Sequence, residues 1–131
     1  MPVRTDVLGA GILIVDDQQT NLRLLELALR RAGYVGVTST AEPRDVCALH
    51  RRNHYDLIML DGQMPRMNGF EVMQSLADDG GKKVPILFLT ADSTQMVSAL
   101  EAGATSFLSK PFVLAEVVRR VQLMLETTLV T

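Results

Sequence analysis

The sequence has few cysteines, no tryptophan and no long apolar stretch, and these shortages exclude several classes of protein. Cys47 is the only cysteine among 131 residues, so no internal disulfide framework can form and a reducing compartment suits the chain. No segment approaches the roughly 18 uninterrupted apolar residues of a membrane span, and the N-terminus lacks the long apolar core of a signal peptide. We therefore expect no membrane segment and a cytoplasmic location.

Positive charge is also scarce. The 13 Lys and Arg residues against 15 Asp and Glu residues give a net charge of -2, and no basic stripe suggests a nucleic-acid surface. We therefore expect no direct contact with nucleic acid. The 47% hydrophobic content and the length of 131 residues indicate one folded domain with a real core. We expect a flexible N-terminal leader at 1–10, the domain at 11–128 and a C-terminal tail at 129–131.

Short apolar segments alternate with segments of helical periodicity. Leu22, Leu25 and Leu29 recur with helical spacing, and Gly33 stands where such a helix would end. The predicted strands are 12–15, 35–38, 57–60, 86–89 and 106–108, and the further helices are about 42–52, 69–79, 93–102 and 113–126. Apolar strands joined by helices predict an α/β fold with a doubly wound parallel sheet and helices on both faces.

Polar residues gather where the predicted strands end. In open sheets of this kind, the carboxyl ends of the strands form the edge where ligands bind. Several carboxylates at one edge repel each other unless a cation lies among them, and oxygen ligands suit Mg²⁺. Phosphoryl transfer needs a nucleophile, a metal ion and a further cation or hydrogen-bond donor. The residues that offer these groups are Asp16, Asp17, Asp61, Thr90 and Lys110.

These motifs resemble the receiver domain of two-component response regulators, over about residues 11–128. Asp16-Asp17 matches an acidic pair at the end of the first strand, and Asp61 is followed by GQMPRMNG, which matches the phosphoacceptor motif. Thr90 in LTAD and Lys110-Pro111 match the later motifs of the family. The resemblance implies a flavodoxin-like (βα)5 fold with strand order 2-1-3-4-5.

The resemblance also implies roles for individual residues. Asp61 would accept the phosphoryl group, and Lys110 would pair with it before and after transfer. Mg²⁺, with Mn²⁺ as an alternative, would be held by Asp16, Asp17, Asp61 and the backbone carbonyl of Gln63. Thr90 would donate a hydrogen bond to the phosphoryl group, and Phe107 would be the switch aromatic. A cis Lys110-Pro111 bond would aim the lysine.

The function implied by the resemblance is a signalling switch and not a separate enzyme. The domain would catalyse its own phosphorylation on Asp61 from a histidine kinase or histidine phosphotransfer protein, and its own dephosphorylation. The new charge would change a surface that a downstream effector or a fused output domain recognises. Formation of a homodimer through the changed surface is a further possibility. Asp92 and Gln63 flank the approach to the phosphoryl group, so we expect them to influence its lifetime.

Other interpretations remain open from the sequence. A small phosphatase of the haloacid-dehalogenase type also uses a strand-end Asp and Mg²⁺, but it needs a second Asp where Gln63 stands. A flavodoxin-like nucleotide or flavin module needs a glycine-rich loop where Asp16 and Asp17 stand. An adjacent Asp pair after a strand is by itself often only a solvated turn or a helix N-cap.

Further residues have simpler interpretations. Cys47, His50 and His54 share one side of a predicted helix and could mimic a zinc site, although a packed thiol and solvated imidazoles explain them as well. Arg119 and Arg120 lie on the last predicted helix and are interpreted as a solvated face. Gly62 replaces the larger residue often found after the phosphoacceptor, which predicts a more mobile loop.

Overall fold

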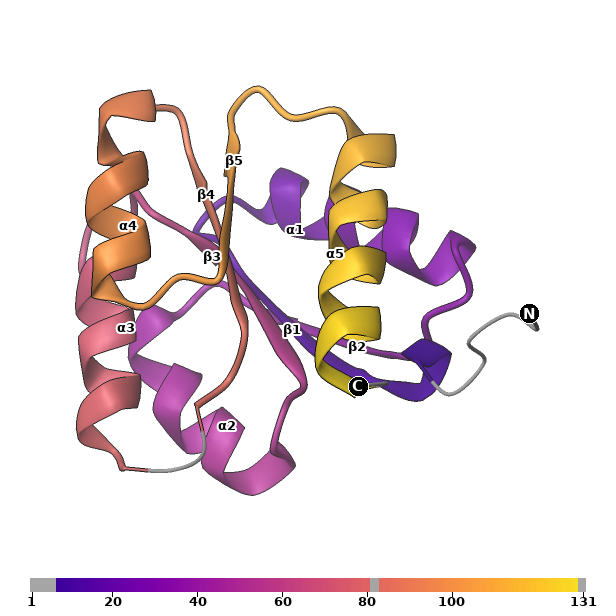
Figure 1. Ribbon diagram of the computed structural model, residues 1–131, viewed down its shortest axis with the longest axis horizontal. Helices are drawn as coiled ribbons and strands as arrows, with labels where there is room; N and C mark the ends of the chain where they lie inside the picture. Colours follow the sequence, from indigo (N-terminus) through magenta and orange to yellow (C-terminus); the bar gives the residue numbers. More distant parts are fainter. Residues whose placement is uncertain (1–6, 81–82, 130–131) are drawn as a thin grey trace.

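A five-stranded parallel sheet organises the molecule. The computed structural model describes residues 7–80 and 83–129. The strands are β1 (Gly11–Val15), β2 (Gly36–Thr40), β3 (Leu57–Asp61), β4 (Ile86–Thr90) and β5 (Ser106–Ser109), and their order is β2-β1-β3-β4-β5 (Figure 1). The predicted flavodoxin-like fold and its strand order 2-1-3-4-5 are confirmed.

Helices cover both faces of the sheet. They are α1 (Gln19–Arg31), α2 (Val46–Asn53), α3 (Gly69–Asp78), α4 (Met96–Ala102) and α5 (Leu114–Leu129). Helices α1 and α5 lie on one face, and α2, α3 and α4 lie on the other (Figure 1). Of the helices in residues 7–80 and 83–129, none is long and apolar enough to cross a membrane.

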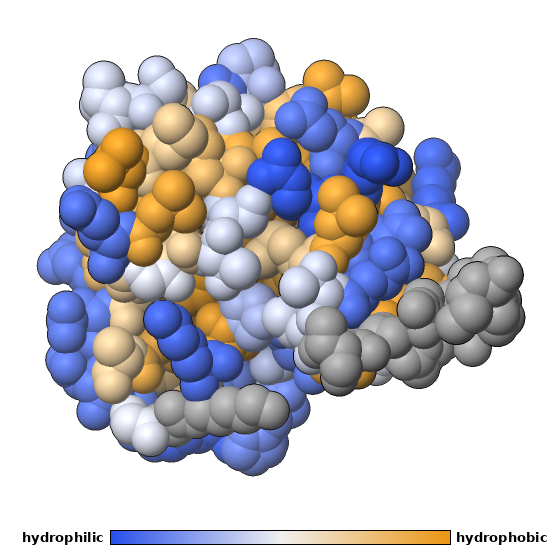
Figure 2. Space-filling model, viewed as in Figure 1, coloured by the Kyte–Doolittle hydropathy of each residue, from blue (hydrophilic) through white to orange (hydrophobic). Residues whose placement is uncertain are grey.

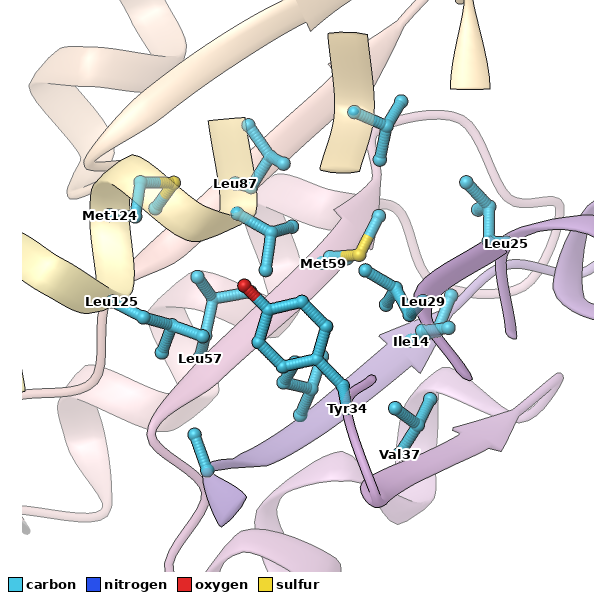
Figure 3. Close-up of a cluster of buried hydrophobic side chains, with 14 of the residues drawn as sticks. Ile14, Leu25, Leu29, Tyr34, Val37, Leu57, Met59, Leu87, Met124 and Leu125 are labelled. Carbon is cyan, nitrogen blue, oxygen red and sulfur yellow. The ribbon is translucent and has the colours of Figure 1, made fainter. Parts of the chain in front are cut away.

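Alternation along the strands divides the core into two clusters. Ile12 and Ile14 point to the α1/α5 side, where they meet Leu25, Leu29 and other buried side chains (Figure 3). Leu13 and Val15 belong to the opposite cluster under α2, α3 and α4. Because successive strand residues face opposite sides, a strand that is apolar at every position must be covered on both faces.

The expected boundaries differ from the structure where side chains cap a turn. The segment predicted as a helix from residue 42 begins instead with a 3₁₀ turn, η2 (Pro43–Asp45), because the Glu42 side chain accepts a hydrogen bond from the backbone N–H of Arg44. The segment from residue 93 likewise begins with η3 (Ser93–Gln95), capped by Asp92. Strand β2 runs to residue 40, beyond the predicted 35–38.

Part of the expected flexible leader packs onto the domain. Residues 1–6 lie outside the described residues, but Val7–Gly9 form a 3₁₀ turn, η1. Val7 is 3% exposed and Ala10 is 4% exposed, and both join the α1/α5 core. A leader that buries an apolar side chain in this way is part of the fold. Of the expected tail, Leu129 ends α5, and 130–131 lie outside the described residues.

Candidate functional site

The ends of four strands bring the predicted site residues to one edge of the sheet. Val15 pairs with Leu60, so Asp16 and Asp61, one residue further along each strand, reach the same edge. Thr90 pairs with Ser109 at the ends of β4 and β5, and Lys110 follows directly. The parallel register therefore assembles residues that are far apart in the sequence.

Three carboxylates form a compact acidic cluster at this edge. Carboxylate oxygens of Asp16, Asp17 and Asp61 all lie within 4.8 Å of one another. Asp16 is 1% exposed and Asp61 is 3% exposed, so bulk water does little to separate their charges. The backbone N–H of Gln18 donates to Asp16 Oδ1 at 2.9 Å, and this bond orients the carboxylate.

Lys110 reaches into the acidic cluster. Its Nζ lies 3.1 Å from Asp61 Oδ1 and 3.5 Å from Asp16 Oδ2. Its backbone N–H donates to Thr90 O at 2.8 Å, which ties the start of the Lys110 loop to β4. The Lys110-Pro111 peptide bond is cis, as predicted. Within the described part of the chain, the ammonium group of Lys110 thus contacts two of the three carboxylates of the cluster.

Burial is the main perturbation of the pKa of Asp61, and the neighbouring charges add to it or oppose it. Burial raises the pKa of this carboxyl from 3.8 to about 6, and the neighbouring Asp16 also raises it. The backbone N–H of Gln63, at 3.2 Å from Asp61 Oδ1, and the ammonium of Lys110 lower the same pKa without cancelling the effect of burial. A further cation would restore the ionised form, and the oxygen-only donor set fits a hard divalent ion such as Mg²⁺.

The Thr90 hydroxyl is held by the loop that follows β4. Thr90 is fully buried. Its Oγ1 accepts a hydrogen bond from the backbone N–H of Asp92 at 3.1 Å and donates one to Gln95 Oε1 at 2.9 Å. Sequence reasoning did not identify Gln95, because no motif or periodicity marks it. The Asp92 carboxylate accepts from Thr94, which lowers the pKa of Asp92.

Phe107 lies on β5 and is half-buried against the core cluster under α2, α3 and α4. Its backbone oxygen accepts a hydrogen bond from Arg120 Nη1 at 3.2 Å, and the same nitrogen donates to Ser106 Oγ at 2.6 Å. The interpretation as a solvated face fits the exposed Arg119 but is wrong for Arg120, since the Arg120 guanidinium ties α5 to β5. A switching role for Phe107 stays a prediction.

Gly62, which follows Asp61, lies in close contact with its surroundings and does not form part of an open loop. Its N–H donates to Leu89 O at 2.8 Å. A Cβ built at Gly62 would lie 2.6 Å from Phe88 Cε2, and one built at Gly69 would lie 2.8 Å from Phe88 Cε1. The Phe88 ring therefore occupies the room that a larger residue after Asp61 would need, and the structure does not support the expected mobility.

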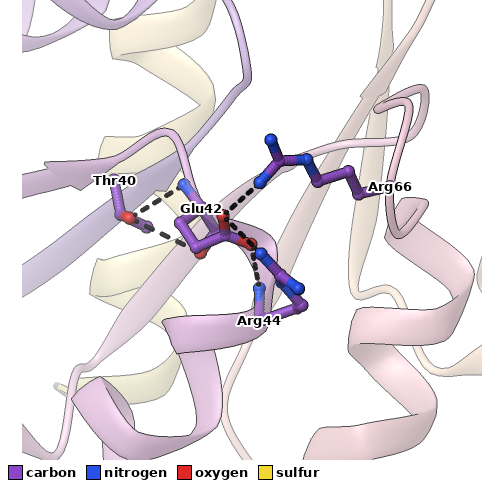
Figure 4. Close-up of polar contacts among 4 residues, drawn as sticks. All are labelled: Thr40, Glu42, Arg44 and Arg66. Carbon is purple, nitrogen blue, oxygen red and sulfur yellow. Dashed lines mark hydrogen bonds and ion pairs between the residues drawn. The ribbon is translucent and has the colours of Figure 1, made fainter.

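An ionic network joins two loops beside the acidic cluster. Glu42 Oε1 lies 2.9 Å from Arg44 Nε, and Glu42 Oε2 lies 3.3 Å from Arg66 Nη1 (Figure 4). Hydrogen bonds from the Arg44 side chain, and then from its backbone N–H, lower the pKa of Glu42 to about 2. A hollow of about 280 Å³ lies between these loops and is lined by Asp17, Glu42, Arg66 and their neighbours.

Among the described residues, Cys47, His50 and His54 do not form a metal site. Within residues 7–80 and 83–129, the acidic cluster is the single group of His, Cys, Asp and Glu side chains with metal-binding geometry. His50 instead accepts a hydrogen bond from the backbone N–H of Tyr55 through Nδ1 at 3.1 Å and stacks on the Tyr55 ring. The expectation of a solvated imidazole is therefore wrong for His50, whose half-buried ring packs on Tyr55.

Comparison with known proteins identifies the family. A family model described as the response regulator receiver domain matches residues 12–122. The chain belongs to the response regulator receiver family. It is a receiver domain of two-component signal transduction, a family of signalling switches. The receiver domain is 35% identical over 113 residues to a probable transcriptional regulator, ycf27, of Porphyridium aerugineum, and this match covers 85% of the chain and 46% of that protein.

Further relatives differ in how much of their length the match covers. Response regulator PleD of Caulobacter vibrioides is 38% identical over 107 residues, covering 79% of this chain but 23% of PleD. The probable transcriptional regulatory protein TcrX of Mycobacterium tuberculosis is 32% identical over 130 residues, covering 98% of this chain and 55% of TcrX. The chain thus spans about half, or less, of these relatives.

Solved structures agree in fold along nearly their whole length. The Vibrio cholerae chemotaxis protein CheY4 superposes with a TM-score of 0.80 at 30% identity, covering 88% of this chain and 98% of that one. The Francisella response regulator 1452 receiver domain superposes with a TM-score of 0.83 at 23% identity, covering 92% and 99%. The second similarity supports the fold alone.

Proposed function

We propose that Asp61 accepts a phosphoryl group in a metal-dependent reaction and that the resulting charge switches the surface of the domain. The observation that carries this proposal is the placement of Lys110 Nζ 3.1 Å from Asp61 Oδ1, beside two further carboxylates. Lys110 both orients the nucleophile and offers a cation to a phosphoryl oxygen. An ion pair that served stability alone would not need the unpaired negative charge around it.

The metal would be held by carboxylate oxygens of Asp16, Asp17 and Asp61, with the backbone carbonyl of Gln63 as a fourth ligand. When bound, Mg²⁺, or Mn²⁺ in its place, neutralises the charge on the oxygens of the transferring phosphoryl group. The pKa of Asp61 is raised first by burial and further by the neighbouring Asp16, and it supports this assignment because a bound cation would favour the ionised carboxylate.

In the transfer itself, a carboxylate oxygen of Asp61 attacks phosphorus on a donor phosphohistidine. The P–O bond to Asp61 forms as the P–N bond breaks, and the imidazole of the donor leaves with the electron pair and then takes up a proton. Lys110 stays beside the phosphoryl oxygens, and the Thr90 hydroxyl donates to one of them. Rotation of Phe107 into the space left by Thr90 then transmits the change to β5 and α4.

The partners follow from this chemistry. A histidine kinase or histidine phosphotransfer protein supplies the phosphoryl group, and a downstream effector or a fused output domain reads the altered surface. The chain acts in the cytoplasm, without direct nucleic-acid contact. Self-association as a homodimer is a further form of output, for which exposed Met96, Val97 and Leu100 on α4 provide apolar surface.

Beryllofluoride, which mimics a phosphoryl group on a carboxylate, tests the proposal. Since the chain has no tryptophan, binding is followed by calorimetry and by fluorine NMR. We expect binding that requires both Mg²⁺ and Asp61 and that is lost in Asp61→Asn and Asp17→Asn. Glu101→Gln, which removes one exposed carboxylate on α4, is the matched control and should bind normally. Binding that persists in Asp61→Asn would overturn the proposal.

A further inference from the structure

The Thr90 hydroxyl already donates one hydrogen bond and accepts another in the structure. A hydroxyl has one proton to donate, and Thr90 gives its proton to Gln95 Oε1 at 2.9 Å. The same oxygen accepts the backbone N–H of Asp92 at 3.1 Å. Among the described residues, both hydrogen-bond partners of this hydroxyl therefore belong to the loop after β4. Thr90 can donate to a phosphoryl oxygen only after it gives up Gln95.

Gln95 is positioned by the backbone and not by chance contact at the surface. It is the last residue of η3, and its N–H donates to Asp92 O at 3.1 Å. The Asp92 side chain caps the same turn by accepting from Thr94 N at 3.0 Å. The turn is thus closed by two bonds, and it presents the half-buried Gln95 amide to a fully buried hydroxyl.

We propose that Gln95 is a positioning residue that competes with the phosphoryl group for the proton of Thr90. This inference rests on the proposed function of Asp61 and Thr90. Without a phosphoryl group, Gln95 keeps the hydroxyl within the β4–α4 loop. With one, a charged oxygen is the stronger acceptor, because hydrogen bonds to ionised groups exceed those between neutral groups. Part of the free energy of phosphoryl binding is therefore used to break the Thr90–Gln95 hydrogen bond, and only the remainder appears as affinity.

The competition also connects the site to a surface. Gln95 is the N-cap residue of α4, so its side chain links the Thr90 hydroxyl to the first turn of that helix. Apolar side chains gather on this face over α4 (Figure 2), where Met96, Val97 and Leu100 are between 44% and 63% exposed. Release of Gln95 loosens the turn that begins the helix carrying these side chains.

Beryllofluoride affinity in Gln95 variants tests the inference. Gln95→Met keeps the length of the side chain and removes the acceptor, so the hydroxyl is free in advance. We expect beryllofluoride to bind about 3- to 10-fold more tightly to Gln95→Met than to the wild type, the range that corresponds to one neutral hydrogen bond. Gln95→Glu keeps an acceptor and adds charge, and its affinity should fall. Ser93→Ala, an exposed change in the same turn, should leave affinity unchanged.

A second background separates the competition from a general effect on the fold. In Thr90→Val, which lacks the hydroxyl, the gain of Gln95→Met should vanish. A gain that persists in Thr90→Val, or no gain in the presence of Thr90, would overturn the inference while leaving the proposed function intact. No Mg²⁺-dependent binding in the wild type would instead reject the proposed function itself. Amide NMR of α4 gives an independent readout, because Gln95→Met should shift its first turn toward the beryllofluoride-bound positions.

Discussion

Alanine at Gly62 should destabilise the receiver domain, although the backbone there would accept it. The φ of Gly62 lies outside the left-handed region, and Gly→Ala at such sites ordinarily stabilises by about 0.4–1 kcal/mol. Here the new Cβ would lie 2.6 Å from both Cε2 and Cζ of Phe88. The expected cost is about 2 kcal/mol, within the range for overpacking of a filled core.

The magnitude depends on whether the Phe88 ring can move away, and the structure indicates that it cannot. Phe88 is fully buried. Gly69 meets its opposite edge, where a Cβ would approach Cε1 to 2.8 Å, and the Phe70 ring lies 5.1 Å from it between centroids. A shift of the ring would therefore displace the start of α3. For a domain of this size, the melting temperature should fall by roughly 6–10 °C.

A double-mutant cycle measured by urea unfolding checks the reasoning. Phe88→Leu alone should cost about 1–2 kcal/mol through lost contacts, but it opens room for the alanine. The loss of stability in the double variant should therefore be smaller than the sum of the two single losses by at least about 1 kcal/mol. Gly9→Ala is the control, because a Cβ there meets nothing within 4 Å. If Gly62→Ala is as stable as the wild type, or if the two costs simply add, the packing account is refuted.

Three further predictions concern other parts of the fold. The Glu42 carboxyl should titrate near pH 2 in carbon NMR, and Arg44→Ala should move this titration toward 4.5; an unchanged midpoint would contradict the assigned cause. Val7→Ala should lower the free energy of unfolding by about 1.5 kcal/mol, whereas a loose leader would show no loss. Burial is the main cause of the lowered pKa of His50. As pH falls below 6.5, His50 therefore becomes protonated in the unfolded chain before it does so in the folded one. Stability should therefore drop from pH 7 to pH 5 more steeply than in His50→Asn, and equal slopes would count against this.

Much of the fold could be predicted because the signals are local. Strands such as β3, with LIML before Asp61, are apolar at every position, and this pattern requires cover on both faces. The acidic cluster could be predicted for the same reason, since strand ends in a parallel sheet meet at one edge. The residues of that cluster and Lys110 lie together as the motif order indicated.

The parts that escaped prediction depend on contacts between distant segments. Val7 looked like part of a leader because its partners, on α1 and α5, lie elsewhere in the sequence. The hydrogen bond of Arg120 to Phe107 O is invisible in a helical pattern that marks position 120 as polar. Gln95 escaped because its significance comes from one hydrogen bond to a buried hydroxyl. Gly62 was misinterpreted because the size of Phe88 matters as much as the absence of a side chain.

Phosphorylation of the purified chain by acetyl phosphate, a small phosphodonor, tests the central claim most directly. The acyl phosphate is trapped by borohydride reduction, and the modified residue is located by peptide mass spectrometry. The account predicts modification of Asp61 alone, dependent on Mg²⁺ and absent in Asp61→Asn. Modification at another residue, or equal modification when the metal is chelated, would contradict it.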